Sequence, residues 1–259
     1  MNTSRRELLK ISGIAIAGAT LAKSADPTLG LIFPVNRPVP DEALAMYPSG
    51  VKFITMDVGL KMMTPQGYDS VIDRIAPAGE KLAARGANAV VLMGTSLSFY
   101  KGAAFNQHLT EILKKATGLP VTTMSTGVVE GLKAVGAKRV VAATAYDDEV
   151  NRRLQVFLKE SGFEVLGVKG LGIEKVEDVN YVTQDGLLKF CAGVRETQPT
   201  ANAMLVSCGG LRTLELLAPL EQRCHLPVIS STPDALWAGV RLLGLSGRAP
   251  GFGTLLSKT

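Results

Sequence analysis

Short apolar runs alternate with longer amphipathic stretches along the chain from Thr28 onward. A short apolar run between turn residues is typical of a buried strand, and a longer stretch with helical spacing is typical of a helix. The pattern predicts strands at Leu29–Phe33, Phe53–Val58, Ala89–Met93, Val121–Met124, Arg139–Thr144, Phe163–Val168, Ala203–Ser207 and Val228–Ser230. It predicts helices at Gly67–Arg85, Ala103–Thr117, Gly127–Val135, Asp147–Ser161, Asp185–Glu196, Thr213–Arg223 and Pro233–Leu243. This alternation indicates an α/β fold with parallel sheets.

The chain also contains an internal repeat. The stretch Ala87–Ser96 resembles Ala201–Gly210, and the offset between them is constant at 201 − 87 = 114 residues. Leu-Pro-Val occurs at 119–121 and again at 226–228. Ordered matches favour a duplication, so we expect two pseudo-symmetric, Rossmann-like lobes with the active site in the cleft between them. We place the first lobe at about 26–124 plus 228–259, and the second at about 125–227.

The most informative stretch is Ser207-Cys208-Gly209-Gly210, which follows the apolar run Ala203–Val206. It predicts a strand, a tight turn and then a helix at Leu211–Leu217. Ligands of parallel α/β sheets bind at the carboxyl ends of the strands, where Cys208 falls. A thiol at this edge is a candidate acid or base, whereas a cysteine that only fills space in the core is the alternative.

The equivalent loop of the first half is Gly94-Thr95-Ser96-Leu97-Ser98. The repeat places Gly94 opposite Cys208, so one half supplies an acid and the other supplies none. Hydroxyl groups at the start of a helix suit a carboxylate or a developing oxyanion, although they are also common helix caps. Tyr146 follows a strand and can turn its phenol towards the cleft. We interpret the hydroxyl clusters at 125–126 and 230–232 as caps.

Composition and charge exclude several classes of function. The chain is 46% hydrophobic and 20% charged, as in globular proteins, and only 5% of its residues are aromatic. It lacks the G-x-G-x-x-G and G-x-x-x-x-G-K-[ST] motifs that bind dinucleotides and triphosphates. Its two histidines and three unevenly spaced cysteines suggest no metal site and no disulfide framework. We therefore expect cofactor-free chemistry on a small carboxylate by a monomer or weak oligomer that binds no nucleic acid.

Residues 1–25 differ in kind from the rest of the chain. Arg5 and Arg6 precede an uncharged apolar segment, Ile11–Ala22, and small residues follow it. This order is typical of an export signal, and the paired arginines resemble the twin-arginine type. The segment is too short for a stable membrane span. We expect a periplasmic protein, or a cytoplasmic one if the leader is not used; removing the leader lowers the net charge from +5 to +2.

Three stretches, Leu92–Tyr100, Ala142–Tyr146 and Leu205–Leu211, resemble the arylmalonate decarboxylase family. The resemblance runs from about Thr28 to Gly253 and includes Thr64–Tyr68. The wider group is the aspartate/glutamate racemase superfamily, whose two-lobed α/β fold agrees with the internal repeat. Racemases of that group carry a cysteine in both halves, whereas this chain has a glycine at position 94. A single acid implies that a proton is delivered to one face of the substrate.

The resemblance implies loss of CO₂ from a 2-aryl-2-alkylmalonate to give one enantiomer of a 2-arylpropionate-type acid. It makes Cys208 the proton donor, and it assigns Thr95, Ser96, Tyr146 and the Gly209 N–H group to the retained carboxylate. It assigns the departing carboxylate to an apolar pocket. The implied substrate-binding residues are Pro34, Leu60, Met63, Tyr68, Gly94, Leu97, Val176, Val179 and Gly210.

This chain departs from the family pattern at three places. The double proline after the first strand is Pro34-Val35 here, Lys61-Met62-Met63 replaces smaller residues, and Arg212 follows the Cys-Gly-Gly turn. These changes leave the reaction type in place and leave the size of the substrate open. The alternatives are a racemase or maleate-type cis–trans isomerase of small carboxylates, and an exported carboxylate-binding protein in which Cys208 has no chemical role.

Overall fold

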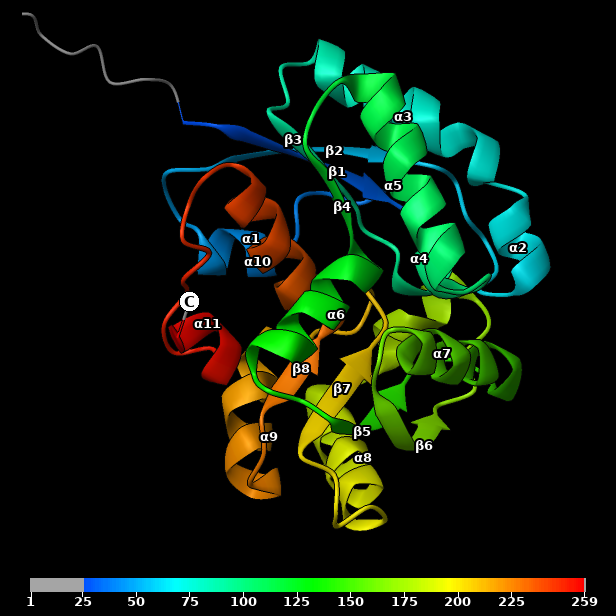
Figure 1. Cartoon of the computed structure of the whole chain (residues 1–259), viewed down its shortest axis with the longest axis vertical. Coiled ribbons are helices and arrows are strands. Elements are labelled where there is room, and N and C mark those ends of the chain that lie inside the picture. The colour runs from blue at the N-terminus through cyan, green and yellow to red at the C-terminus, as the bar shows by residue number, and fades with distance from the viewer. Residues whose placement is uncertain (1–25, 259) are drawn as a thin grey trace, which may run out of the picture.

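Two four-stranded parallel sheets form the centre of the computed structural model, which describes residues 26–258 (Figure 1). The first sheet has the order β2-β1-β3-β4 and the second has the order β6-β5-β7-β8. The expected α/β fold with two lobes of parallel strands is confirmed. The strands are β1 (Thr28–Phe33), β2 (Lys52–Asp57), β3 (Ala89–Leu92), β4 (Val121–Thr123), β5 (Arg139–Thr144), β6 (Glu164–Gly170), β7 (Ala203–Ser207) and β8 (Val228–Ser230).

The two sheets repeat each other in detail. β1 lies between β2 and β3 as β5 lies between β6 and β7, and Ala89 and Ala203 occupy equivalent places in the register. The Asn88 Oδ1 atom accepts a hydrogen bond from the Thr28 N–H group, 2.8 Å away. The Asn202 Oδ1 atom likewise accepts from the Arg139 N–H group, 2.8 Å away. Equivalent side chains therefore anchor equivalent strands, as a duplication requires.

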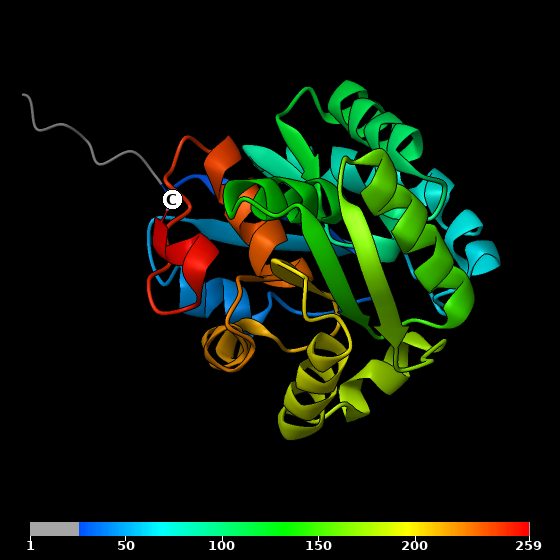
Figure 2. The ribbon, with the colours of Figure 1, turned by 60° about the horizontal axis from the view of Figure 1, so that its bottom comes forward.

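Helices cover both sheets, and the views in Figures 1 and 2 place α3 and α5 on the first lobe and α7, α8 and α9 on the second. The helices of the first half are α1 (Asp41–Met46), α2 (Pro65–Asp69), η1 (Ile72–Arg74), α3 (Ile75–Ala84), α4 (Thr95–Phe99), α5 (Ala103–Thr117) and α6 (Met124–Ala134). Those of the second half are α7 (Asp148–Glu160), η2 (Val176–Tyr181), α8 (Gln184–Glu196), η3 (Leu214–Leu216), α9 (Leu217–Cys224), α10 (Ser231–Leu242) and α11 (Thr254–Lys258).

Two predicted helices differ from the expected ones. The stretch Gly67–Arg85 divides into α2, η1 and α3. A helix running through this whole stretch would place Pro77 in its interior, where proline removes a hydrogen bond, whereas α3 holds Pro77 in its first turn. The helix expected at Leu211–Leu217 begins only at Leu214, as η3. The turn that contains Cys208 is thus not followed at once by a helix N-terminus.

Helices α6 and α10 pack against each other between the two sheets. α10 follows β8 of the second sheet yet contacts β3 and β4 of the first. Gly127 and Gly131 allow this approach, since a Cβ atom at Gly127 would lie 2.9 Å from the Asp234 carbonyl oxygen. We expected the chain to return to the first lobe at Val228. This is wrong because β8, which begins at Val228, pairs with β7 of the second sheet. The return starts at Ser231, with α10.

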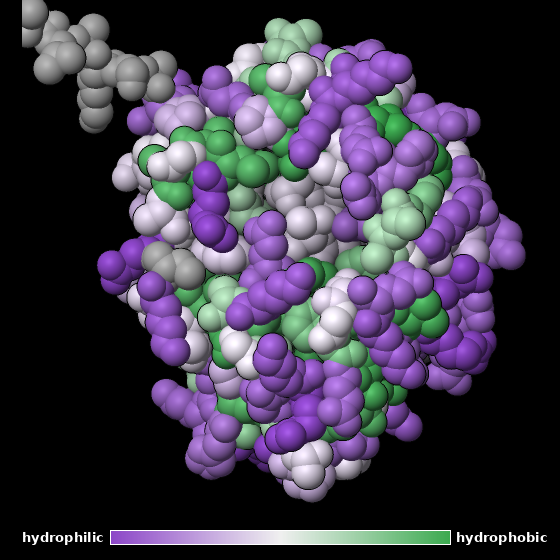
Figure 3. Space-filling model, viewed as in Figure 1, coloured by the Kyte–Doolittle hydropathy of each residue, from purple (hydrophilic) through white to green (hydrophobic). Residues whose placement is uncertain are grey.

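One face of the molecule is mainly polar. Hydrophilic side chains cover most of the face in Figure 3, and apolar ones lie in small groups between them. Across residues 26–258, no helix has both the length and the apolar character needed to cross a membrane. The predicted export signal lies outside the described residues.

Candidate active site

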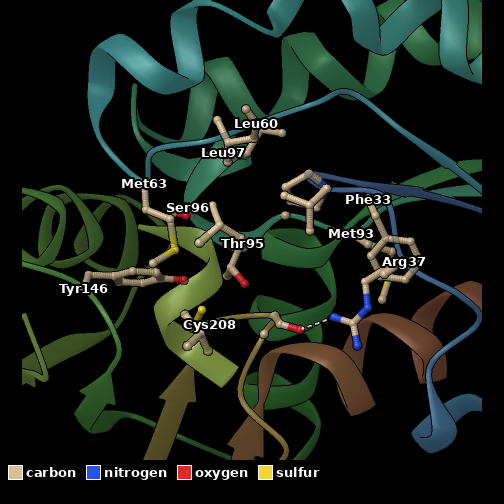
Figure 4. Close-up of a pocket in the computed structure, with 17 residues that line it drawn as sticks. Phe33, Arg37, Leu60, Met63, Met93, Thr95, Ser96, Leu97, Tyr146 and Cys208 are labelled. Atoms are coloured by element: carbon tan, nitrogen blue, oxygen red, sulfur yellow. Dashed lines mark hydrogen bonds between the residues drawn. The ribbon is translucent and has the colours of Figure 1, made fainter. Parts of the chain in front are cut away.

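One cavity between the lobes collects nearly all of the residues that the sequence singled out (Figure 4). The space inside it, including the open mouth, is about 490 Å³. The predicted residues that line it are Pro34, Leu60, Met63, Gly94, Thr95, Ser96, Leu97, Tyr146, Val176, Val179, Cys208, Gly209 and Gly210. Tyr68 is not a lining residue. It is buried, with its ring tilted against that of Tyr100 at a centroid distance of 5.0 Å.

Cys208 lies at the carboxyl end of β7 with 5% of its surface exposed, and Figure 4 shows its sulfur facing the cavity. Burial raises the pKa of the Cys208 thiol to about 11, although the N–H groups of Gly210 and Leu211 and the charge of Arg37 oppose this shift. No helix starts at this turn, so no helix dipole favours the thiolate, and the loss of solvation on burial dominates. The side chain is therefore a neutral thiol at pH 7.

Thr95 and Ser96 begin α4, directly after Gly94. Gly94 is the residue of the first sheet that corresponds to Cys208 in the second. Gly94 is the N-cap residue, and no side chain caps this helix. The cap interpretation therefore does not apply to the two hydroxyl groups. Both residues are buried, with Thr95 3% exposed, and both line the cavity. The N–H groups in the first turn of a helix have no partner within it, so they add donors here.

A chain of buried hydroxyl groups connects the two lobes behind the cavity. Thr95 Oγ1 donates to Ser231 Oγ at 2.8 Å, and Ser231 Oγ accepts from the Cys208 N–H group at 3.2 Å. Ser231 also reaches Ser207 Oγ at 3.5 Å, and the Tyr146 hydroxyl lies 3.3 Å from Ser207 Oγ. Burial and then the Cys208 thiol raise the pKa of Tyr146, so its hydroxyl stays protonated and can donate.

The cap interpretation is also wrong for the clusters at 125–126 and 230–232. Ser231 forms part of the hydroxyl chain, and Thr232 Oγ1 donates to the Gly209 carbonyl oxygen at 3.1 Å. Ser125 Oγ donates to the Thr95 carbonyl oxygen at 2.9 Å. The side chain that caps α6 is instead Thr123, which accepts from the Thr126 N–H group. These hydroxyl groups therefore hold the loops that contain Thr95 and Gly209 in place.

The apolar wall of the cavity comes from two loops, one in each lobe. Leu60 and Met63 precede α2, and Val176 and Val179 belong to η2. Backbone hydrogen bonds join the loops: the Met63 N–H group donates to the Glu174 carbonyl oxygen at 2.7 Å, and Val176 donates to Lys61 at 3.3 Å. This part of the cavity offers no charged side chain to a ligand.

Four lining residues were not predicted: Phe33, Val35, Arg37 and Met93. Phe33 and Met93 end apolar runs that already accounted for them as core, and Arg37 has no periodic signal in a loop of prolines. The two histidines, His108 and His225, are both exposed, and neither lines the cavity. Within residues 26–258, no three His, Cys, Asp or Glu side chains gather in a way that could hold a metal ion.

A family model described as arylmalonate decarboxylase matches residues 29–256. The chain belongs to the arylmalonate decarboxylase family. It is therefore an enzyme of the carboxy-lyase class, as expected. The arylmalonate decarboxylase of Bordetella bronchiseptica is 44% identical over 241 residues, which cover 92% of this chain and 100% of that protein. A maleate isomerase of Pseudomonas putida is 26% identical over 161 residues, which cover 60% of this chain and 64% of the isomerase.

Solved structures of the family have the same fold. A liganded arylmalonate decarboxylase variant with one Gly-to-Cys and one Cys-to-Ser substitution has a TM-score of 0.87 and 44% identity, covering 90% of this chain and 100% of that one. Its two substituted positions are 114 residues apart, as Gly94 and Cys208 are here (208 − 94). A maleate isomerase from Pseudomonas putida S16, at 21% identity and a TM-score of 0.82, covers 90% of this chain and 98% of its own and shares the fold.

Proposed function

We propose that this enzyme decarboxylates 2-aryl- and 2-aryl-2-alkylmalonates to 2-arylacetates and 2-arylpropionates, with Cys208 as the proton donor and without a cofactor. The observation that carries the proposal is a buried thiol with a raised pKa that faces the same cavity as the hydroxyl groups of Thr95, Ser96 and Tyr146. An acid on one wall and neutral donors on another are what an enediolate intermediate needs.

The hydroxyl groups would bind the carboxylate that the product retains. Loss of CO₂ leaves an electron pair on the α-carbon, which delocalises onto both oxygens of this carboxylate. Donors already in place stabilise that new charge more than they stabilise the substrate, and so they accelerate the reaction. Because hydroxyl protons rotate, Ser231 can donate to Thr95 Oγ1 and so free the Thr95 proton to face the substrate. The Gly209 N–H group would add a backbone donor.

The departing carboxylate would lie against Leu60, Met63, Val176 and Val179. An apolar wall gives a carboxylate few hydrogen bonds, which raises the free energy of this charged group. The neutral CO₂ molecule needs no such hydrogen bonds. The C–C bond would break with its electrons passing to the α-carbon. The same wall thus favours the product of this step over its reactant.

Cys208 would then protonate the α-carbon. The S–H proton moves to carbon, a C–H bond forms, and the sulfur becomes a thiolate that recovers a proton from water. Its raised pKa keeps the thiol intact until the carbanion forms. Gly94, across the cavity, carries no acid. Protonation from one side gives one enantiomer.

A turnover assay with two substrates tests this function. Phenylmalonate and methylphenylmalonate are mixed with the purified enzyme, and CO₂ release and product handedness are measured. We expect CO₂ from both and one enantiomer from the second. Interconversion of the enantiomers of a carboxylate, or of maleate and fumarate, without CO₂ would instead indicate the racemase or isomerase alternative. Binding without any turnover would indicate a carboxylate-binding protein.

We also propose that residues 1–25 direct export by a twin-arginine route, based on Arg5, Arg6 and the apolar segment after them. All three cysteines are buried, which slows their oxidation in a periplasm. N-terminal sequencing of the protein from a periplasmic fraction tests the route. Replacement of Arg5 and Arg6 by lysine should trap the protein in the cytoplasm, and unchanged distribution would contradict the proposal.

A further inference from the structure

Arg37 places a positive charge in a cavity that is otherwise neutral. It lies in the loop after β1, is half-buried, and lines the cavity beside Phe33 and Gly209. Its Nη1 atom donates to the Gly209 carbonyl oxygen at 3.2 Å, and its guanidinium carbon lies 5.1 Å from the centre of the Phe33 ring (Figure 4). A guanidinium has five N–H donors, so this single hydrogen bond leaves most of them unused.

No carboxylate within residues 26–258 forms an ion pair with Arg37. Glu42 is the strongest opposing charge, but its Oε1 atom accepts from the N–H groups of Thr213 and Leu214, at 3.2 and 3.4 Å. Asp41 is exposed and acts on Arg37 more weakly, and Arg212 adds a second positive charge at the same mouth. Burial lowers the pKa of Arg37, yet a guanidinium remains charged at neutral pH. The charge of Arg37 is therefore only partly compensated.

Arg37 lies on the side of the cavity that neither malonate carboxylate would occupy in the proposed function. Figure 4 shows Arg37 and Phe33 across the cavity from Met63 and Tyr146. The hydroxyl groups and the apolar wall account for the two malonate carboxylates. In the proposed function this leaves the α-substituent to face the side of Arg37 and Phe33.

We propose that Arg37 binds an anionic group on the α-substituent, so that the preferred substrates are malonates whose aryl group carries a carboxylate or a similar anion. The malonate part of this statement rests on the proposed function. A planar guanidinium matches a carboxylate with two parallel hydrogen bonds, and such bonds are strong when partly shielded from water. The family resemblance did not suggest this residue, and the exposed Arg212 would reinforce the same preference.

A purely positioning role for Arg37 makes a different prediction. Arg37 and Thr232 both donate to the Gly209 carbonyl oxygen, at 3.2 and 3.1 Å, and so fix the peptide whose N–H group faces the Cys208 sulfur. If this were the whole role, loss of Arg37 would affect every substrate equally. Thr232 keeps that carbonyl paired when Arg37 is replaced, so the two roles can be separated by comparing substrates.

The test compares kcat/KM for phenylmalonate with that for 3- and 4-carboxyphenylmalonate. The wild type should prefer a carboxylated substrate, and Arg37→Gln should reduce that preference by about tenfold to hundredfold, the range for a hydrogen bond to a charged group. Arg37→Lys should retain part of it. The control is Lys52→Gln, which removes an exposed charge at the start of β2, the opposite end of the sheet, and should keep the wild-type preference. An equal effect of Arg37→Gln on all three substrates would overturn the proposal.

Calorimetry separates this inference from the proposed function. Binding of 4-carboxyphenylacetate and phenylacetate is measured for the wild type and Arg37→Gln. If no malonate loses CO₂ but the wild type binds the carboxylated acid more tightly and the variant does not, the proposed function fails and the anion site stands. If malonates lose CO₂ and neither binding nor turnover depends on the extra carboxylate, the proposed function stands and the anion site fails.

Discussion

The loops after β3 and β7 occupy equivalent places in the two sheets but carry different chemistry. After β3 comes Gly94, and α4 starts at once with buried hydroxyl groups. After β7 comes Cys208, and the five residues 209–213, of which the first two are glycines, separate it from the next helical turn at Leu214. The first loop thus supplies neutral donors around a position with no side chain, and the second supplies a protonated thiol. A duplicated scaffold has become asymmetric at the two positions where a planar intermediate would meet it.

The largest expected effect comes from removing the acid of the second loop. Cys208→Ser should lower kcat by about 10³-fold, within the range for a positioned general acid, because a serine hydroxyl is a far weaker acid than a thiol. Binding of phenylacetate should persist, since serine fits the same space. CO₂ release and calorimetry measure the two effects. Turnover within tenfold of the wild type would remove Cys208 from the mechanism.

The next effect comes from the donors of the first loop. Thr95→Val should lower kcat by about 10²-fold, the usual loss for one oxyanion donor, with a smaller change in KM. The matched control is Thr122→Val on β4, because the buried Thr122 hydroxyl has no hydrogen-bond partner within residues 26–258. Steady-state kinetics on phenylmalonate compare the variants. Equal losses in both would mean that the Thr95 effect is a packing effect.

Adding an acid to the first loop should change stereochemistry more than rate. A Cβ atom at Gly94 would lie 3.0 Å from Leu97 Cβ and 3.2 Å from Pro34 Cγ, so a side chain fits after small shifts. A relative with cysteine in place of a glycine has been solved, which indicates that the fold accepts the change. Gly94→Cys should exchange the α-proton of a 2-arylpropionate in D₂O and racemise it, whereas Gly94→Ala should not. Optically stable product with Gly94→Cys would contradict the pseudo-symmetric placement.

The smallest effect concerns pH. In the proposed mechanism Cys208 must be protonated to act, so activity is lost as pH rises through the pKa of its thiol. Because burial raises this pKa from 9.0 to about 11, kcat/KM should stay level through pH 9 and fall only near pH 11. An unperturbed thiol would already have lost half of its activity at pH 9. A midpoint near 9 in the pH profile would show that the thiol is solvated in solution.

Strands and the repeat could be predicted because each depends on a local pattern. Apolar runs placed all eight strands found in residues 26–258, and the equivalence of Ala87–Ser96 with Ala201–Gly210 placed the two loops. Ser231 was missed because its role depends on α10 crossing between the lobes, which no local pattern encodes. Arg37 was missed for a similar reason: its loop folds back over the Gly209 carbonyl, a contact across 172 residues. Tertiary contacts of this kind decide which polar residues face a cavity.

Product handedness tests the asymmetry of the two loops most directly. The double variant Gly94→Cys/Cys208→Ser moves the only thiol of the cavity to the opposite wall and leaves Thr95, Ser96 and Tyr146 unchanged. Chiral analysis of the acid formed from methylphenylmalonate should give the enantiomer opposite to the wild-type product. The same enantiomer as the wild type, or a racemate, would contradict protonation from the wall that carries the cysteine.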